Sequence, residues 1–163
     1  MDLKLSTLIW MLPFAFALHN LEEIFGMEKW TKSIPSFIHK PVTTRQFGVA
    51  VTLFTVLGFV IVFAKGFYQT EKQYHFAIAA FAGMLWLNVF LPHLFATLYL
   101  KKYAPGVITG LVLNLPLATL ILLKMDTNAL LTLKELFFAI MIGGIIGIAL
   151  AGLFLKIGRV LGF

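Results

Sequence analysis

Charged residues divide the chain into apolar stretches of about the length that a lipid bilayer requires. The clearest stretch covers residues 46–64, 19 residues without a charge between Arg45 and Lys65. A helix needs about 20 apolar residues to cross a hydrocarbon layer of about 30 Å. Because backbone polar groups find no water in that layer, such a stretch has to form a helix. The pattern therefore predicts an all-α, polytopic membrane protein.

Five stretches of this kind occur, and we expect them to form a single bundle in one membrane domain, residues 1–163. The predicted transmembrane helices cover about 5–27, 46–64, 76–100, 103–123 and 136–155. Only Lys101 and Lys102 separate the third helix from the fourth, which predicts a tight antiparallel hairpin. The longest connection, residues 28–45, mixes basic and aromatic side chains, and we expect it to lie along the headgroup layer.

Composition agrees with a membrane location and excludes other classes. Hydrophobic residues make up 60% of the chain and charged residues 12%, too few to cover a water-soluble globule. The net charge of +6 would suggest nucleic acid in a soluble protein, but here the basic residues lie between apolar stretches. We therefore expect no nucleic-acid partner. The absence of cysteine excludes disulfides, thiolate metal ligands and iron–sulfur clusters.

The distribution of Lys and Arg predicts an orientation. With five spans, the N-terminal side holds five of these residues and the opposite side holds eight. Because cytoplasmic loops are enriched in Lys and Arg, we expect the N-terminus outside and the C-terminus inside. Ala15-Phe16-Ala17 has the form of a signal-peptide cleavage site, but the segment before it lacks net positive charge, and we expect a retained helix.

A histidine and two glutamates lie near the end of the first predicted helix, in FALHNLEEIFG (residues 16–26). His19 is spaced i, i+3 from Glu22 and i, i+4 from Glu23, so that all three share one helix face. His19 lies about 13 Å of helical rise from the Glu28/Lys29 boundary, and His93 lies about 12 Å from Lys101. The two histidines are thus expected at the same depth, on neighbouring helices.

Two asparagines extend this predicted polar cluster. Asn88 precedes His93 by five residues, and Asn114 lies at a similar level on the fourth helix. If these helices are neighbours, all the groups can meet in one pocket, and Pro92 and Pro116 would kink the helices around it. The alternative is that both asparagines only form hydrogen bonds between helices.

A second alternative concerns the motif itself. If the first span ended at Leu18, the segment HNLEE would be a wet interfacial turn whose carboxylates pair with Lys29 or Lys32. Against this, apolar residues continue past the glutamates.

The string His19-Asn20-Leu21-Glu22-Glu23 resembles the signature of the bacterial HXXEE family, small integral membrane proteins named for this motif near the N-terminus. The first-helix location, the chain length and the later Asn88 to His93 segment are also similar. The resemblance implies a bacterial cytoplasmic membrane protein with a site at His19, Glu22 and Glu23, and it names no reaction.

The ligand types suggest a metal. Two imidazoles and a carboxylate suit catalytic zinc with one position open for water, and a second carboxylate would act as general base. His19, His93 and one of Glu22 and Glu23 would bind, and the other glutamate would accept the proton. The same set suits non-haem Fe(II). The spacing differs from the HExxH of known zinc proteases, so a site without metal stays open.

The first functional hypothesis is an intramembrane enzyme acting on a lipidic or membrane-embedded substrate, by metal-assisted hydrolysis or by His/Glu acid–base chemistry. A metal-free isomerase or lyase is a variant. One alternative is a small proton- or cation-coupled transporter, for which an inverted repeat is lacking, or an ion-binding membrane protein. The other is a non-catalytic accessory membrane protein.

The fifth predicted helix carries small residues at every fourth position: Ala139, Gly143, Gly147 and Ala151. Such a stripe allows close approach of another helix. It either packs inside the bundle or forms a homodimer, and both roles stay open.

Overall fold

The computed structural model describes residues 3–161, which are almost entirely helical and contain no strand. The elements are α1 (Leu5–Lys32), α2 (Thr44–Phe63), η1 (Ala64–Phe67), α3 (Glu71–Asn88), η2 (Val89–Leu94), α4 (Phe95–Leu100), α5 (Val107–Thr109), η3 (Gly110–Asn114), α6 (Leu115–Thr127) and α7 (Leu133–Val160). Segments η2 and η3 are π-helical.

These elements join into five helices that are long and apolar enough to cross a membrane. Within the described residues they are Leu5–Lys32, Thr44–Phe67, Glu71–Leu100, Val107–Thr127 and Leu133–Val160. The predicted all-α class with five spanning helices is confirmed, and the protein is an integral membrane protein. Its orientation stays a prediction.

The boundaries differ from the predicted ones around two connections. α1 continues to Lys32, so that the first connection begins at Ser33 instead of residue 28. The expected two-residue hairpin is longer and covers residues 101–106, because α4 ends at Leu100, with Lys101 as its C-cap, and α5 begins after Gly106. Lys101 and Gly106 have positive φ, 51° and 92°, which reverses the chain at each end of the linker.

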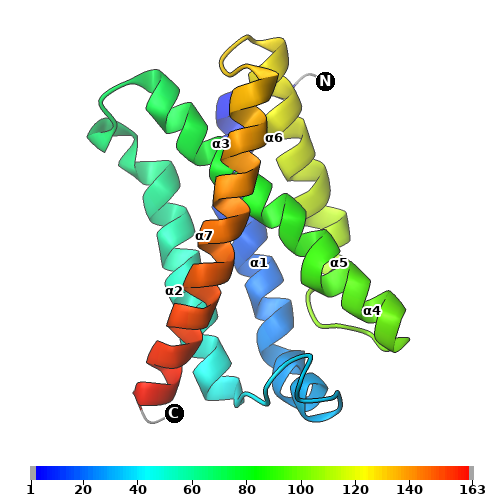
Figure 1. Cartoon of the computed structure of the whole chain (residues 1–163). Helices are drawn as coiled ribbons and strands as arrows, with labels where there is room; N and C mark the ends of the chain where they lie inside the picture. Colours follow the sequence, from blue (N-terminus) through cyan, green and yellow to red (C-terminus); the bar gives the residue numbers. More distant parts are fainter. Residues whose placement is uncertain (1–2, 162–163) are drawn as a thin grey trace.

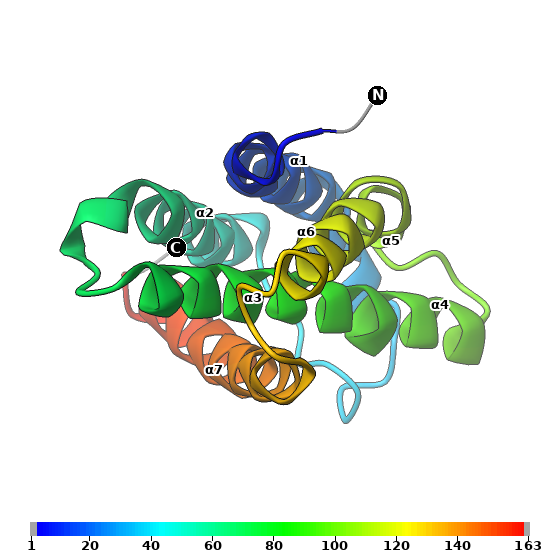
Figure 2. The same ribbon diagram turned by 90° about the horizontal axis from the view of Figure 1, so that it is seen from above.

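The helices form a bundle around α3 (Figure 1). In the end-on view, α3 runs through the middle, with α7 on one side and α1 and α6 on the other (Figure 2). α1 also packs along α2, and α2 along α7. The apolar core lies between these helices, and its fully buried side chains include Leu12, Ile78, Leu85, Ile121 and Met125. This core fixes the relative positions of α1 and α3, the two long helices on which the site depends.

The small-residue stripe of α7 packs inside the chain. Ala139, Gly143 and Gly147 are buried, and a Cβ atom on Gly143 would lie 2.0 Å from the backbone oxygen of Ala80 in α3. The small side chains are therefore needed for the close crossing of α7 and α3. A homodimer stays a prediction, but these three residues are not available to form it.

The third spanning helix is interrupted in η2. Leu91 has non-helical dihedral angles (φ −127°, ψ 107°), directly before Pro92. Proline disfavours the helical conformation of the preceding residue and has no N–H to donate. π-helical segments are common at functional sites, and this one carries His93.

Candidate metal site

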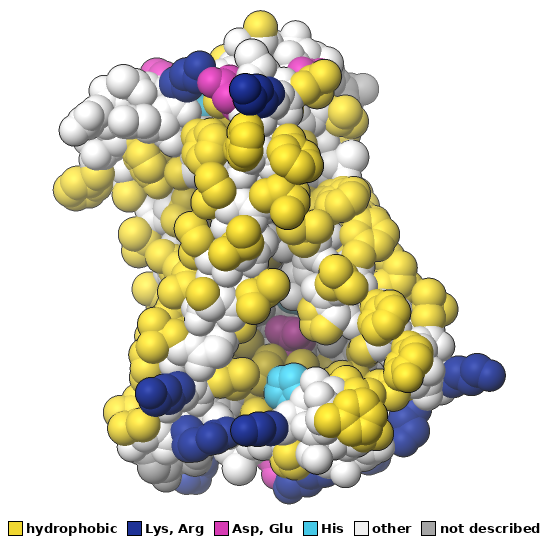
Figure 3. Space-filling view, in the orientation of Figure 1, with side chains coloured by type: hydrophobic (Ala, Val, Ile, Leu, Met, Phe, Trp, Pro, Cys, Tyr) yellow, Lys and Arg dark blue, Asp and Glu magenta, His cyan; other side chains and the backbone are white. Residues whose placement is uncertain are grey.

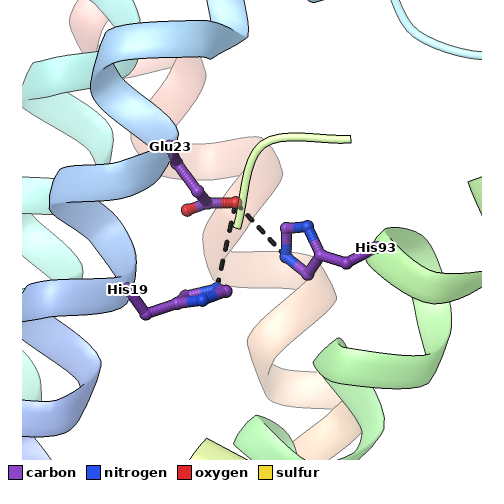
Figure 4. Close-up of side chains that lie close together, drawn as sticks. All are labelled: His19, Glu23 and His93. Atoms are coloured by element: carbon purple, nitrogen blue, oxygen red, sulfur yellow. Dashed lines mark ion pairs between the residues drawn. The ribbon is translucent and has the colours of Figure 1, made fainter. Parts of the chain in front are cut away.

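Three ionisable side chains from α1 and η2 meet inside the bundle (Figure 4). His19 is 0% exposed, His93 2% and Glu23 8%. Oε1 of Glu23 lies 3.3 Å from Nε2 of His93 and 4.0 Å from Nε2 of His19. One ligand atom of each residue lies within 4.8 Å of the other two. The motif is thus buried in a continuous helix, and does not form an interfacial turn.

Asn88 lies against both imidazoles at the end of α3. Its Nδ2 is 3.2 Å from Nε2 of His19 and 3.0 Å from Nε2 of His93. An amide NH2 group carries two hydrogens, so it can donate one to each ring nitrogen. Both Nε2 atoms are then unprotonated, and each accepts a hydrogen from Asn88 beside the carboxylate of Glu23.

The other ring nitrogens fix the same tautomer. Nδ1 of His19 lies 3.1 Å from the hydroxyl oxygen of Thr109, and the backbone carbonyls of Gly106 and Pro105 lie close to the rings of His19 and His93, respectively. The Thr109 hydroxyl itself donates to Glu22, so that its oxygen can only accept from His19. Metal-binding histidines are held in this way, with the outer nitrogen bonded to a carbonyl or a carboxylate.

Glu22 lies outside the cluster, although it is adjacent to Glu23 in the sequence. Its carboxylate accepts hydrogen bonds from the Tyr103 hydroxyl, from the backbone N–H groups of Gly106 (2.9 Å) and Thr109 (2.8 Å), and from the Thr109 hydroxyl. It binds the N-terminal turn of α5, where free N–H groups favour a negative charge. Burial, together with the bond to Glu22, raises the pKa of Tyr103 to about 12. Glu22 therefore ties the linker to α1.

Gly106 lies between the two histidine rings. A Cβ atom there would approach Cε1 of His19 and of His93 to 2.8 Å each, and Cγ of Glu23 to 3.0 Å. Its φ of 92° is also one that residues with a side chain rarely adopt. The linker therefore closes over the cluster with its backbone.

The structure brings together four of the six residues selected from the sequence: His19, Glu23, His93 and Asn88. Asn114 is fully buried, but neither its side-chain oxygen nor its nitrogen has a hydrogen-bond partner among the described residues. Sequence reasoning missed Thr109, Tyr103 and Gly106. One signal was available, because a Pro-Gly pair before an apolar stretch, at the same membrane end as the motif, indicates a turn close to it.

A cavity of about 380 Å³ adjoins the cluster. Side chains of α1, α2, α3 and α7 line it, and the lining is apolar except for Asn20, Glu23 and Asn88. In the space-filling view, a hollow opens on the side of the bundle, with an acidic side chain at its base (Figure 3). Glu23 therefore belongs to both the cluster and the cavity wall.

The cluster has the chemistry of a cation site. Two imidazole lone pairs and a carboxylate oxygen converge, and the amide of Asn88 is the donor placed between them. A metal ion would take the two Nε2 lone pairs that Asn88 otherwise occupies, and its charge would be balanced in part by the carboxylate beside them. Two nitrogens and one oxygen with fixed tautomers are a three-ligand set that suits zinc or Fe(II). The residues present therefore fit a divalent metal.

Comparison with known proteins agrees with the motif. Residues 10–121 match the family described as "Protein of unknown function with HXXEE motif". The chain is also similar to "Uncharacterized protein YrkK" of Bacillus subtilis (strain 168), with 37% identity over 145 residues, which cover 89% of this chain and 91% of that protein. No solved structure matches. The predicted resemblance is confirmed, and the chain belongs to the HXXEE family of membrane proteins.

Proposed function

We propose that this protein is an intramembrane, metal-dependent hydrolase that acts on a lipidic or membrane-embedded substrate. One observation carries the proposal: Glu23 lies both in the His19–Glu23–His93 group and in the wall of an apolar cavity. A substrate whose apolar part fills the cavity would bring its polar part to the ligand atoms. Ligand pockets have this form, apolar walls with a few convergent polar groups.

His19, Glu23 and His93 would hold the ion, Zn²⁺ or Fe²⁺. A bound ion of this kind supplies Lewis acidity and an activated water. Glu23 turns Oε1 toward both histidines, which leaves Oε2 to accept a proton from the attacking water. Asn88 also lines the cavity. A bound ion would take the two Nε2 lone pairs to which the Asn88 NH2 group otherwise donates, and this group would then donate to the substrate's carbonyl oxygen as negative charge develops there.

The remaining residues position these groups. Thr109 and Pro105 hold the outer ring nitrogens, so that each Nε2 faces inward. The linker excludes water from the end of the bundle, which strengthens electrostatic interactions inside.

The experiment is elemental analysis of the detergent-purified protein. We expect close to one zinc or iron per chain in the wild type, and loss of that metal in His19→Ala and His93→Ala. The matched control is His75→Ala, because His75 lies at the start of α3, far along that helix from the site. Equal metal content in all four proteins would refute the ligand assignment.

A metal-free acid–base enzyme is the second candidate. It is favoured by the 3.3 Å separation of Glu23 Oε1 and His93 Nε2, which is close enough for one shared proton. Wild-type protein that takes up no zinc or Fe²⁺ on reconstitution, yet loses activity on Glu23→Gln, would support this candidate over the hydrolase with metal.

A further inference from the structure

The cavity opens sideways, toward the surface that meets the lipid tails. α7 and α3 cross in the upper half of the bundle and diverge below, and the hollow lies between their lower halves (Figures 1 and 3). Leu91, which is 62% exposed, and the exposed Pro92 line the cavity where α3 is interrupted. α7 contributes small residues here, among them Gly144, Gly147 and Ala151. An apolar chain can therefore enter from the bilayer without crossing water.

Few polar groups in the cavity are free to bind a ligand. The side-chain NH2 of Asn20 already donates to Thr55 (2.8 Å) and to the carbonyl of Val51 (3.3 Å) in α2. Glu23 remains, and so does Asn88 once a bound ion has released its NH2 group from the two histidines; both belong to the site. The lining therefore suits a long apolar chain with one polar linkage, such as an ester, and does not suit a sugar or a nucleotide.

Charge is strongly unequal between the two ends of the bundle. The end nearer the site carries eight basic residues: Lys29, Lys32, Lys40, Arg45, Lys101, Lys102, Lys156 and Arg159. Apart from Glu22 and Glu23 of the motif, its one described acidic residue is Glu28, which is paired with Lys32 at 2.6 Å. The other end has five lysines, and three described acidic residues partly offset them: Glu71, Asp126 and Glu135. Basic side chains gather at the lower end, below the hollow (Figure 3).

The depth of the site places the cavity close to the basic end of the bundle. Glu23 precedes Lys29 by six residues, about 9 Å of helical rise. On α7, the cavity lining ends at Leu155, next to Lys156. The site thus lies one to two helical turns inward of the basic residues, a separation that a glycerol unit bridges.

We propose that the cavity binds an acyl chain of an anionic glycerolipid, with its ester at Glu23 and Asn88 and its headgroup among the basic residues. This names the substrate class of the proposed hydrolase and rests on that function for the cleavage, whereas the binding stands without it. Hydrolysis breaks the bond between the acyl carbon and the alkoxy oxygen. The hydroxyl of water goes to the acyl carbon and its proton to the leaving alcohol, which gives a fatty acid and a lysolipid.

The test measures lipid binding without turnover. Purified protein is mixed with phosphatidylglycerol or phosphatidylcholine of the same chain length, and bound lipid is counted by native mass spectrometry. Ala151→Phe fills the cavity without removing a polar group. Gly152→Phe is the matched control, because Gly152 is exposed and a Cβ atom there has nothing within 4 Å. Elution volume and the midpoint of thermal unfolding show whether each variant is folded.

We expect the wild type and Gly152→Phe to retain phosphatidylglycerol, and Ala151→Phe to bind it on the order of tenfold more weakly, about 1.4 kcal/mol. The pair Lys156→Gln/Arg159→Gln should lose the preference for phosphatidylglycerol, whereas Lys65→Gln/Lys134→Gln at the other end should keep it. Equal binding by folded Ala151→Phe and wild type would overturn the cavity assignment.

Equal binding of both lipids by the wild type would overturn the headgroup assignment. The lipid-binding proposal and the proposed function can each fail without the other. Lipid bound in the cavity of a protein that takes up no metal refutes only the metal-dependent hydrolase. Metal without cavity-bound lipid refutes only the substrate class.

Discussion

Thr109 is the residue through which Glu22 acts on the site, so Thr109→Val tests the orientation of His19. Valine has almost the same shape as threonine but lacks the hydroxyl that contacts Nδ1 of His19 and Glu22. Glu22 would keep its bonds from Tyr103 and from the two backbone N–H groups, so the linker should stay in place. The change therefore removes the contact with His19 and one of the four hydrogen bonds to Glu22.

The expected magnitude follows from the contacts that are lost. The ring of His19 is fully buried, and its outer N–H would lose the Thr109 oxygen, a loss of about 1–3 kcal/mol for a buried group. Removing a partner of a metal-binding histidine typically weakens metal binding by about 10–100-fold. We expect zinc affinity to fall within that range, and thermal stability of the metal-free protein to fall slightly.

The assay is competition for zinc between the purified protein and a chromophoric chelator. Thr109→Ser should keep most of the affinity, because it keeps the hydroxyl. Thr119→Val is the matched control, since Thr119 is equally half-buried and its hydroxyl donates only to the Leu115 carbonyl in α6. Unchanged affinity in Thr109→Val, or an equal loss in Thr119→Val, would refute the proposed relay from Glu22 to His19.

Further substitutions test the packing and the linker. Gly106→Ala should abolish metal binding in elemental analysis, because its Cβ atom would reach both rings at 2.8 Å and its φ is strained. Gly143→Leu should lower the midpoint of thermal unfolding by many degrees, because its Cβ atom meets the α3 backbone, whereas Gly152→Leu should not. The phenol of Tyr103 should ionise near pH 12 instead of about 10 in a difference titration against Tyr103→Phe. Its raised pKa means that its stabilising contact is complete below about pH 10 and is lost as the pH rises toward 12. Glu22→Gln should move this ionisation back toward pH 10.

The helices and the central cluster could be predicted from the sequence, because they depend on bilayer thickness and on helical rise per residue. Bilayer thickness fixes the length of each apolar stretch, so the five spanning helices follow from the positions of the charges. Helical rise gives the depth of each residue in the membrane, and it predicts the same depth for His19 and His93. Side chains at equal depth on packed helices can meet, and these two rings do, with centroids 4.9 Å apart.

The division of roles between Glu22 and Glu23 could not be predicted in this way. Neighbouring residues on a helix point about 100° apart, and which of the two faces the cavity depends on the rotation of α1 against α3. That rotation is set by core packing, which leaves no local pattern in the sequence. Asn114 shows the same limit, because it is buried in the bundle but its side chain forms no bond to the cluster.

The linker partners of Glu22 were hidden for a different reason. Thr109 and Gly106 act through backbone groups and one hydroxyl, and their positions depend on the length of the connection between α4 and α5. Nothing in their chemistry distinguishes them from other loop residues. A turn with positive φ at both ends is needed before they face α1.

The position of Gly106 between the two imidazoles limits how the length of the linker can change within this family. Because a bare backbone fits between the rings, inserting or deleting one residue in the linker would bring a neighbour's Cβ atom into that gap. The five helices could still insert into the membrane, since their apolar lengths would be unchanged. We therefore expect relatives that keep the His19–Glu23–His93 cluster to vary freely in the other loops while holding this loop to a constant length.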